Sequence, residues 1–382
     1  MTDSTTWKPW LLSVALLTLC ACGGGSGSSG TPSNPPPTAD PWAPVTAAIQ
    51  AAQSQFPNGL CVEVATPQGV VYSQGFGGFT NATPTLVASA SKWVTSTVIL
   101  RLVQAGAFPH GLDTQAKELL VDGSGNPWAG NMGDITLRQL LSFTSGISGD
   151  DAASEALLIT LKAAVEQIYA DDAATASAPG SYFYYGSTHM RIAARMAEVA
   201  TGKKWSQLFA EQLHDPWGWA SDSIYSGGGP NPNPAGGLKC TGLEYMRFLV
   251  MQLRGGLDGT TTYLSPALIT AQRTDGYGPN TTLSYSPYFD RLGKTYHYAL
   301  GNWLETAGGG GPTPTDPVVR FSSTGTFGWA PWVAADGVYG GIIMTQQPTQ
   351  GDTVPSENLK NQLDPLIRTA LAANPPVIRT VP

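Results

Sequence analysis

The apolar residues that follow Ser89 are spread almost all around a helix, a pattern typical of a helix buried on every side. The Thr-Pro-Thr sequence at 83–85 interrupts the chain before this stretch, and Gly106 ends it. We therefore predict that a buried helix begins at Ser89. Its large apolar side chains are Trp93, Val94, Val98, Ile99, Leu102 and Val103.

The two ends of the chain have patterns typical of a sheet with covering helices. Residues 44–56 have the spacing of an amphipathic helix, and residues 60–65 and 70–75 predict a hairpin across the turn at 66–69. Near the other end, four apolar runs predict strands, and a closing amphipathic stretch predicts a helix. The strands span 298–305, 318–322, 329–334 and 338–345, and the helix spans 356–373.

Between residues 108 and 290 strand signals are sparse, and helices are predicted at 135–141, 155–169, 190–201 and 241–253. We therefore predict an α+β fold, with an antiparallel sheet flanked by helices from both chain ends. Residues 43–107 and 291–382 would form this α/β subdomain, and residues 108–290 a mainly helical inserted subdomain. A cleft between the two would have Ser89 at its floor.

The N-terminal residues predict export. Residues 1–21 combine Lys8 with a short apolar stretch at 10–19, as in a signal peptide. The sequence Leu-Cys-Ala-Cys at 19–22 resembles a bacterial lipobox, which implies lipidation of Cys22; the alternative is an ordinary signal peptide cleaved nearby. Residues 22–42, rich in Gly, Ser and Pro, predict a flexible tether. We expect a lipid-anchored protein of the cell envelope, in the periplasm or at the outer membrane.

Composition narrows the partners further. The net charge of −7 and the lack of a basic run argue against nucleic-acid binding. The four histidines form no i,i+4 pair and there is no cysteine cluster, so we predict no metal site. After the N-terminal segment two cysteines remain, Cys61 and Cys240. An exported protein permits a disulfide between them, but we favour two buried free thiols.

Ser89 and Lys92 form the S-x-x-K arrangement of acyl-transferring serine enzymes. At a spacing of three on a helix, the amine hangs over the same face as the hydroxyl. A buried lysine loses the solvation of its ammonium, so its pKa falls and it can accept the serine proton. A chance match is the alternative, although Lys92 alone among nine lysines has a serine three residues before it.

The aromatic loop at 179–187 supplies a candidate proton shuttle, Tyr185. We expect an ammonium nearby to lower the pKa of its phenol, so that it could pass a proton to a leaving group. Aromatic side chains in such a loop can also simply pack, and a second Tyr-x-Ser occurs at 263–265. The order along the chain favours Tyr185.

Residues 321–328 predict a strand end that could stabilise negative charge. A backbone N–H at such an edge can point at the developing oxyanion, together with the N–H of Ser89. Gly325 would let the acyl group approach closely. The alternative is an ordinary turn rich in Ser, Thr and Gly between two strands.

Taken together, these motifs resemble the serine beta-lactamase-related superfamily, which includes class C beta-lactamases, D-alanyl-D-alanine carboxypeptidases and esterases of the same fold. The matching segments are 89–92, 135–147, 179–187, 215–219, 235–238 and 323–325. The resemblance implies a beta-lactamase/transpeptidase-like fold. Ser89 would be the nucleophile, Lys92 and Tyr185 the proton-transfer pair, and the N–H groups of Ser89 and Thr326 the oxyanion hole. It requires no cofactor.

Two positions depart from this family's pattern. The third motif usually begins with Lys or His, and here it begins with Ser323, followed by Thr324. The residue two after the tyrosine is often Asn, and here it is Ser187. A hydroxyl supplies no charge for a substrate carboxylate, although a nearby Arg could replace it. We therefore expect a monomeric hydrolase of small esters or amides.

Two alternatives stay open. The first is a beta-lactamase or peptidoglycan D,D-carboxypeptidase, which would use the same mechanism on another substrate. The second is a non-catalytic binding module of the cell envelope on the same fold, since fold does not fix function.

Overall fold

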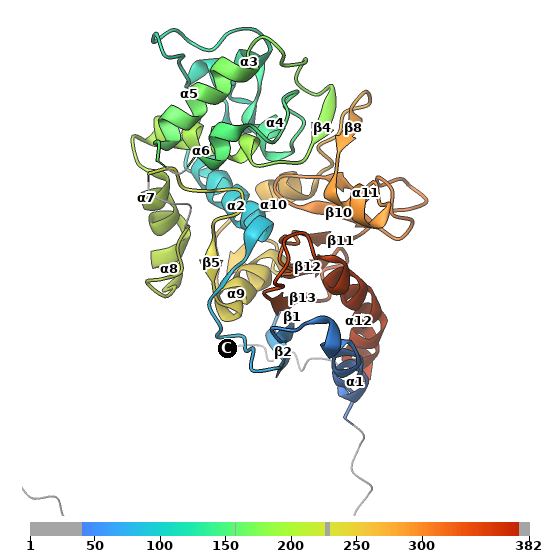
Figure 1. Ribbon diagram of the computed structural model, residues 1–382. Coiled ribbons are helices and arrows are strands. Elements are labelled where there is room, and N and C mark those ends of the chain that lie inside the picture. The colour runs from blue at the N-terminus through green and yellow to red at the C-terminus, as the bar shows by residue number, and fades with distance from the viewer. Residues whose placement is uncertain (1–39, 157, 226–229, 374–382) are drawn as a thin grey trace, which may run out of the picture. The chain divides into compact units, whose positions relative to one another are not determined.

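The structure is a computed structural model that describes residues 40–156, 158–225 and 230–373 (Figure 1). The expected signal peptide, Cys22 and most of the expected tether lie outside these residues. In the described part, no helix combines the length and the apolar character needed to cross a bilayer.

Seven strands form one antiparallel sheet in the order β2-β1-β13-β12-β11-β10-β9. The first and last parts of the chain meet in it, because β1 pairs with β13. The strands are β1 (Leu60–Thr66), β2 (Gly69–Phe76), β9 (His297–Tyr298), β10 (Trp303–Thr306), β11 (Val318–Ser322), β12 (Ala330–Ala334) and β13 (Gly340–Thr345).

Helices cover both faces of this sheet (Figure 1). On one face, α1 (Ala43–Ala52) and α12 (Val354–Ala373) pack on apolar residues of the sheet such as Val62 and Val64. On the other face lie α9 (Gly242–Leu253) and α2 (Ser91–Gln104). The expected α+β class, with helices from both chain ends on an antiparallel sheet, is confirmed.

The middle of the chain is mainly helical, as expected, with short strand pairs at its edges. Its helices are α3 (Gly130–Asp134), α4 (Leu137–Leu141), α5 (Leu161–Asp172), α6 (Thr188–Thr201), α7 (Trp205–Phe209), α8 (Asp215–Trp217), α10 (Pro266–Arg273) and α11 (Pro287–Leu292). The strand pairs are β3 (Thr85–Leu86) with β5 (Lys239–Cys240), β4 (Tyr182–Tyr184) with β8 (Thr282–Tyr285), and β6 (Leu257–Asp258) with β7 (Thr261–Thr262). The division at residue 290 stays a prediction, and α9, from before it, packs on the sheet.

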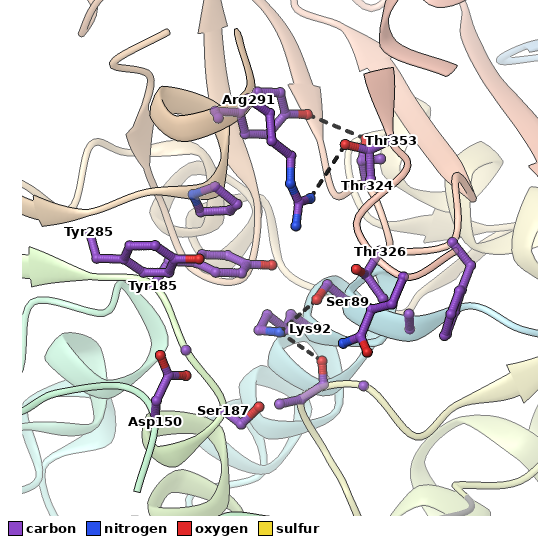
Figure 2. Close-up of a pocket in the computed structure, with 18 of the residues that line it drawn as sticks. Ser89, Lys92, Asp150, Tyr185, Ser187, Tyr285, Arg291, Thr324, Thr326 and Thr353 are labelled. Carbon is purple, nitrogen blue, oxygen red and sulfur yellow. Dashed lines mark hydrogen bonds between the residues drawn. The ribbon is translucent and has the colours of Figure 1, made fainter. Parts of the chain in front are cut away.

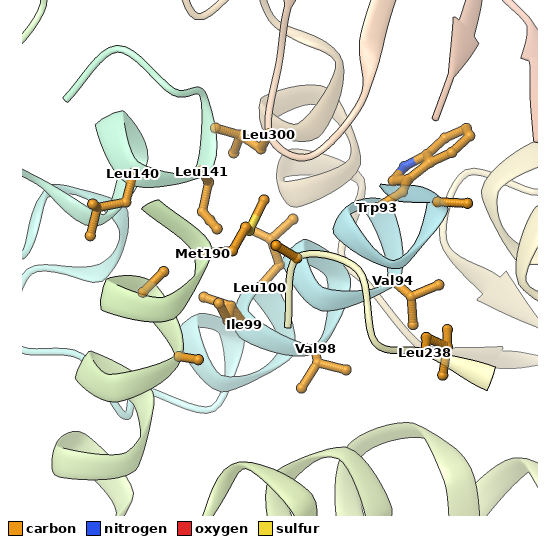
Figure 3. Packing of buried hydrophobic residues seen from close by; sticks show 14 of the residues in the cluster. Trp93, Val94, Val98, Ile99, Leu100, Leu140, Leu141, Met190, Leu238 and Leu300 are labelled. Carbon is orange, nitrogen blue, oxygen red and sulfur yellow. The ribbon is translucent and has the colours of Figure 1, made fainter. Parts of the chain in front are cut away.

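Helix α2 runs through the centre of the molecule, between the sheet and the helical part (Figures 1 and 3). Trp93, Val94, Val98 and Ile99 are all fully buried. Burying side chains of this size contributes roughly 1.5–3 kcal/mol each. The predicted buried helix is confirmed, although α2 begins at Ser91, two residues after the expected start. Its first residues are held in place by packing on every side.

Two predicted elements differ from the structure. The single strand expected at 298–305 is divided into β9 and β10 by a turn, in which Gly301 has a φ of +85°. A Cβ on Gly301 would lie 2.6 Å from the carbonyl oxygen of Lys92, so the turn exists where the chain passes α2. The helix expected from residue 155 begins only at Leu161, where the Thr160 side chain caps it.

Cys61 and Cys240 are both buried and unpaired, which confirms the expectation of free thiols. Burial raises the pKa of the Cys61 thiol to about 12, and it raises that of Cys240 as well. Neither thiol is therefore a reactive thiolate near neutral pH.

Candidate active site

Ser89 lies in a single 3-10 turn, η2 (Ala88–Ala90), that leads directly into α2. The preceding residue, Ala88, has a φ of +48°, in the left-handed region that residues with a Cβ rarely adopt. Such a conformation costs about 1–3 kcal/mol and persists where the surroundings impose it. The sequence carried no signal for it. Because Ser89 is in the first turn, its N–H has no acceptor within the helix.

Residues 323–325 hold this turn from the end of β11. A Cβ on Gly325 would lie 2.2 Å from the carbonyl oxygen of Val87, so only glycine fits there. The missing side chain of Gly325 therefore makes room for the backbone before Ser89. The expectation that it also makes room for an acyl group stays a prediction. Ser323 is 2% exposed, and its hydroxyl donates to the carbonyl oxygen of Ser89 at 3.1 Å. Ser323 therefore supports the nucleophile's turn and does not line the pocket described below.

Lys92 is 3% exposed, and its Nζ donates to Ser89 Oγ at 3.0 Å and to the carbonyl oxygen of Ala235 at 2.9 Å (Figure 2). Burial lowers the pKa of Lys92 to about 7, although the charges of Glu155 and Asp150 act to raise it. The neutral amine is therefore accessible near neutral pH, and its contacts within hydrogen-bond distance are uncharged. The spacing of three residues had predicted this contact.

Tyr185 lies beside the same pair. Lys92 Nζ is 4.7 Å from the centre of its ring, and the ring stacks on Trp303 at 5.1 Å. Burial raises the pKa of the Tyr185 phenol, although a hydrogen bond with Ser89 and the charge of Arg291 act to lower it. The expected fall in this pKa is therefore wrong, because desolvation of the phenolate outweighs the nearby charge. Tyr185 is a neutral phenol at physiological pH.

A buried histidine that sequence reasoning missed supports the backbone before Tyr185. His189 Nε2 is 2.8 Å from the carbonyl oxygen of Tyr184, and its Nδ1 is 2.8 Å from the hydroxyl of Ser145. A carbonyl only accepts, so Nε2 carries the proton and Nδ1 accepts from Ser145. Burial lowers the pKa of His189 to about 4, which keeps the ring neutral. The ring thus fixes the chain one residue before the phenol.

Three other expected site residues line the pocket in different ways. Ser187 lies on the side of the helical part, and its N–H donates to Gly149 at 2.7 Å. Thr324 donates its hydroxyl to Glu357 at 2.6 Å, so this hydroxyl is already engaged. Thr326 accepts the N–H of Gly351 on its own hydroxyl at 2.9 Å. The role of the Thr326 N–H in an oxyanion hole stays a prediction.

One pocket of about 350 Å³ is lined by Ser89, Lys92 and Tyr185 together with these three residues (Figure 2). Sequence motifs predict the serine, the lysine, one tyrosine and the threonines of this pocket. Its charged walls come from distant segments that no motif marks. Arg291 enters from the end of α11, and Asp150 and Glu155 from the loop region after α4. The other lining residues include Ala88, Asn233, Gly236, Tyr285, Tyr288, Leu292, Phe327 and Gln350.

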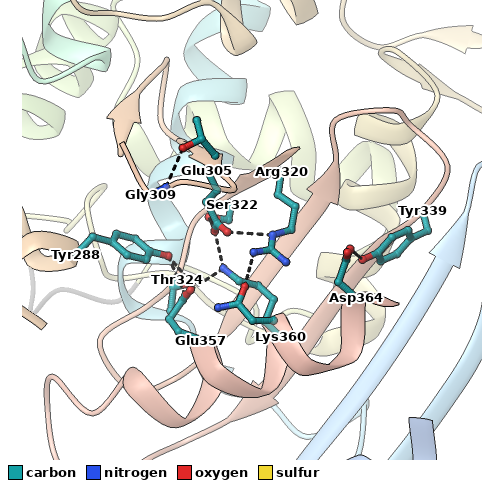
Figure 4. Close-up of polar contacts among 12 residues, drawn as sticks. Tyr288, Glu305, Gly309, Arg320, Ser322, Thr324, Tyr339, Glu357, Lys360 and Asp364 are labelled. Atoms are coloured by element: carbon teal, nitrogen blue, oxygen red, sulfur yellow. Dashed lines mark hydrogen bonds and ion pairs between the residues drawn. The ribbon is translucent and has the colours of Figure 1, made fainter. Parts of the chain in front are cut away.

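A buried ionic network lies behind the pocket, between β10, β11 and α12 (Figure 4). Glu305 pairs with both Lys360 and Arg320. These two cations hold the pKa of Glu305 down to about 2, although burial acts to raise it. Lys360 also pairs with Glu357 at 2.7 Å, and Glu357 in turn accepts the hydroxyl of Thr324. The network therefore fixes one wall of the pocket from behind.

In the described residues, no group of three or more His, Cys, Asp or Glu side chains is arranged to hold a metal ion.

Comparisons with known proteins agree with this fold. The sequence model of a family described as Beta-lactamase matches residues 47–362. Penicillin-binding protein 4 of Amycolatopsis lactamdurans is 32% identical over 130 residues, which is 34% of this chain and 33% of that protein. The match therefore spans about a third of that relative.

Two solved structures are similar over most of the chain. A protein of Bacteroides dorei named as a candidate beta-lactamase is 28% identical, with a TM-score of 0.71 over 86% of this chain and 99% of that one. EstCE1, named as a hydrolase with promiscuous acyltransferase activity, is 17% identical, with a TM-score of 0.62 over 83% of this chain and 97% of that one. The second likeness shows the fold alone.

Proposed function

Because the chain belongs to the beta-lactamase family, whose members are generally hydrolases, we propose that it is a serine hydrolase of small esters or amides. The reaction would proceed through an acyl-enzyme on Ser89. The observation that carries the proposal is the contact of 3.0 Å between Ser89 Oγ and the buried amine of Lys92. An amine with a pKa near 7 is matched to accepting a proton at neutral pH.

In the first step, the neutral amine of Lys92 accepts the hydroxyl proton of Ser89 as Oγ attacks the substrate carbonyl carbon. The carbonyl π bond breaks, and its electron pair becomes the oxyanion, to which the N–H groups of Ser89 and Thr326 would donate. The tetrahedral intermediate then collapses. The bond to the leaving group breaks, and the leaving atom takes a proton.

Tyr185 is the proposed donor of that proton. Its neutral phenol gives its proton to the leaving alcohol or amine and takes one from the ammonium of Lys92, so no phenolate need accumulate. The raised pKa of this phenol keeps its proton in place at neutral pH, so the phenol has a proton to give. Water then attacks the acyl-enzyme with the same groups in reversed roles, and releases the acid and free Ser89.

One observation favours esters and amides over beta-lactams and peptides that end in D-Ala-D-Ala. Ser323 stands where the family usually has a cation, and its hydroxyl already donates a hydrogen bond to the carbonyl oxygen of Ser89. A beta-lactamase or D,D-carboxypeptidase is the second candidate, favoured by the 32% identity to a penicillin-binding protein.

We further propose that Cys22 is lipidated and anchors a monomeric enzyme in the cell envelope, with residues 22–42 as the tether. Metabolic labelling with an alkynyl fatty acid tests this: wild type would take up the label and Cys22→Ala would not. Equal labelling of both would refute the anchor.

A fluorophosphonate probe on the full chain in detergent tests the proposed chemistry. We expect wild type to be labelled and Ser89→Ala not to be. Unlabelled wild type would favour the non-catalytic binding module. Turnover of a nitrophenyl ester, a cephalosporin and a D-Ala-D-Ala peptide then ranks the substrate classes. Cleavage of the peptide with no turnover of the ester would refute the preference for esters.

A further inference from the structure

We propose that His189 holds Tyr185 in position to give its proton to the leaving group. The role rests on the proposed acyl transfer at Ser89, and it makes this buried imidazole decide which leaving groups that reaction can use. His189 is not among the residues that line the pocket, so it is a positioning residue that acts through its contact with the backbone next to Tyr185.

His189 lies in the first turn of α6 and is 0% exposed. Its ring stacks on the ring of Phe143, with 4.9 Å between the ring centres. Phe143 in turn meets the ring of Tyr185 edge-on, at 5.3 Å. The imidazole is therefore packed into the same aromatic cluster that surrounds the phenol, which limits how either ring can move.

The peptide group between Tyr184 and Tyr185 is bonded at both of its polar atoms. Its carbonyl oxygen, on Tyr184, accepts from His189 Nε2 at 2.8 Å. Its N–H, on Tyr185, donates to the carbonyl oxygen of Tyr285 at 3.1 Å. Because a peptide group is planar, these two bonds fix the plane from which the phenol side chain projects. Without His189, one side of this peptide group would be released and its carbonyl would lose its donor.

Ser145 keeps the proton of this imidazole on the nitrogen that faces Tyr184. Ser145 is 0% exposed and its hydroxyl lies 2.8 Å from His189 Nδ1, so it donates to that nitrogen when the ring is neutral. Burial and the charge of Lys92 both act to lower the pKa of the ring. A neutral His189 also does not oppose the ammonium that forms on Lys92 when Ser89 attacks.

The place of the Tyr185 hydroxyl matters most for leaving groups that cannot depart without a proton. An alkoxide or an amine anion is too basic to leave unprotonated near neutral pH, whereas a nitrophenolate is stable there. We therefore expect a displaced Tyr185 to slow the cleavage of alkyl esters and amides, and to leave that of nitrophenyl esters almost unchanged. His189 would thus be needed for poor leaving groups and not for good ones.

The 4-nitrophenyl and ethyl esters of one short carboxylic acid test the proposal. Both give the same acyl-enzyme, so their kcat/KM values differ only through the steps before it, in which the leaving group departs. In His189→Leu we expect kcat/KM for the ethyl ester to fall about 10–100-fold, a part of the 10²–10⁴-fold that a positioned proton donor contributes. The nitrophenyl ester should lose less than about threefold, because its leaving group needs no proton.

His189→Gln should recover most of the ethyl-ester activity that His189→Leu loses, since its side-chain amide can still donate to the Tyr184 carbonyl. Ser145→Ala should lose part of that activity, because the imidazole proton is then free to move to Nδ1. His214→Leu is the matched control and should keep the wild-type ratio of the two esters. His214 also contacts a backbone carbonyl, that of Ala220 at 3.0 Å, but lies in a separate segment between α7 and α8. The ratio, measured on one sample, does not depend on how much of it is folded.

A His189→Leu that slows both esters alike would overturn the proposal, and so would a wild type that cleaves the nitrophenyl ester but not the ethyl ester. The fluorophosphonate probe separates these failures from that of the proposed function, because its fluoride leaves without a proton. Labelled Ser89 with an unchanged ratio in His189→Leu refutes the role of His189 alone. Unlabelled Ser89 refutes the proposed chemistry and, with it, this role.

Discussion

Two lysines of the described residues are almost wholly buried, and their surroundings differ in charge. Lys360 is 0% exposed and contacts two carboxylates, Glu305 and Glu357. Lys92 is 3% exposed, and its amine contacts a hydroxyl and a carbonyl oxygen, with no carboxylate within ion-pair distance among the described residues. Burial without a paired charge lowers the pKa of Lys92 to about 7.

The difference teaches that burial alone does not decide what a lysine does. At Lys360, two carboxylates pair with the ammonium, and these ion pairs stabilise one wall of the pocket. At Lys92, the amine contacts only neutral groups, so its charged form is destabilised and the neutral amine is available as a base. The two regions are connected, because Glu357 of the network also holds Thr324 and Tyr288 of the pocket.

The largest expected effect is on chemistry at Lys92. In Lys92→Met we expect acylation by the fluorophosphonate to slow by roughly 10²–10⁴-fold, the usual contribution of a positioned base. The rate can be measured by stopping the labelling reaction at a series of times and quantifying the labelled protein on a gel. Wild-type acylation in this variant would refute the role of Lys92.

Stability should respond in the opposite sense at the two lysines. In Lys360→Met the buried carboxylates of Glu305 and Glu357 lose their shared ammonium, although Glu305 keeps Arg320, and we expect the free energy of unfolding to fall by about 3–5 kcal/mol. Urea unfolding at pH 7 measures it, and adding Glu305→Gln should recover part of the loss. A Lys360→Met as stable as wild type would contradict the structural role of the pair.

Lys92→Met should keep or raise the free energy of unfolding at neutral pH. The folded pKa of Lys92, about 7, lies below the unfolded value of 10.5, so between these values the unfolded chain binds more protons. The contribution of the lysine therefore opposes folding most strongly at and below pH 7 and fades as pH rises. Urea unfolding at pH 6.5 and pH 9 should show that the Met variant lacks this dependence.

The rate of acylation should depend on pH with one ionisation near neutrality. Because the neutral amine is the active form, we expect the rate to rise with pH and to be half-maximal near pH 7. A probe without ionisable groups isolates this ionisation. A rate that is flat from pH 5.5 to 9 would mean that Lys92 does not supply the base.

The smallest expected effect is a shift in the pH dependence of the acylation rate. The charge of Glu155 acts to raise the pKa of Lys92, so Glu155→Gln should lower it and shift the rising limb to lower pH. Because the Glu155 side chain is 64% exposed, we expect a shift of only a few tenths of a pH unit, roughly that of a screened charge. Glu166→Gln, a glutamate paired with Lys162 and outside the pocket, is the control. A shift toward higher pH would contradict the electrostatic account.

Local sequence rules predicted the parts of the site that depend on neighbours along the chain. The contact of Ser89 with Lys92 follows from helical spacing, and the short helix expected at 135–141 is found at Leu137–Leu141, where Thr136 caps it. The fold class followed from where apolar runs occur. These features need no knowledge of how distant segments meet.

The features that sequence reasoning missed depend on tertiary contacts. Ser323 was expected to face the substrate, but it faces the Ser89 backbone because β11 ends directly behind that turn. The pKa of Tyr185 rises because Trp303 and its neighbours exclude water, which no local pattern shows. Arg291 joins the pocket from a helix about 200 residues after Ser89. A local sequence pattern does not show that two segments so far apart in the chain line the same pocket.

The titration of Lys92 itself tests the central claim most directly. Carbon-13 NMR of protein with labelled lysine side chains, with the Lys92 signal assigned from its loss in Lys92→Met, would follow the amine as pH changes. The account predicts a midpoint near pH 7. A midpoint near the unperturbed value for lysine, about 10.4, would contradict it, because the amine beside Ser89 would then be an ammonium at neutral pH and could not accept the proton.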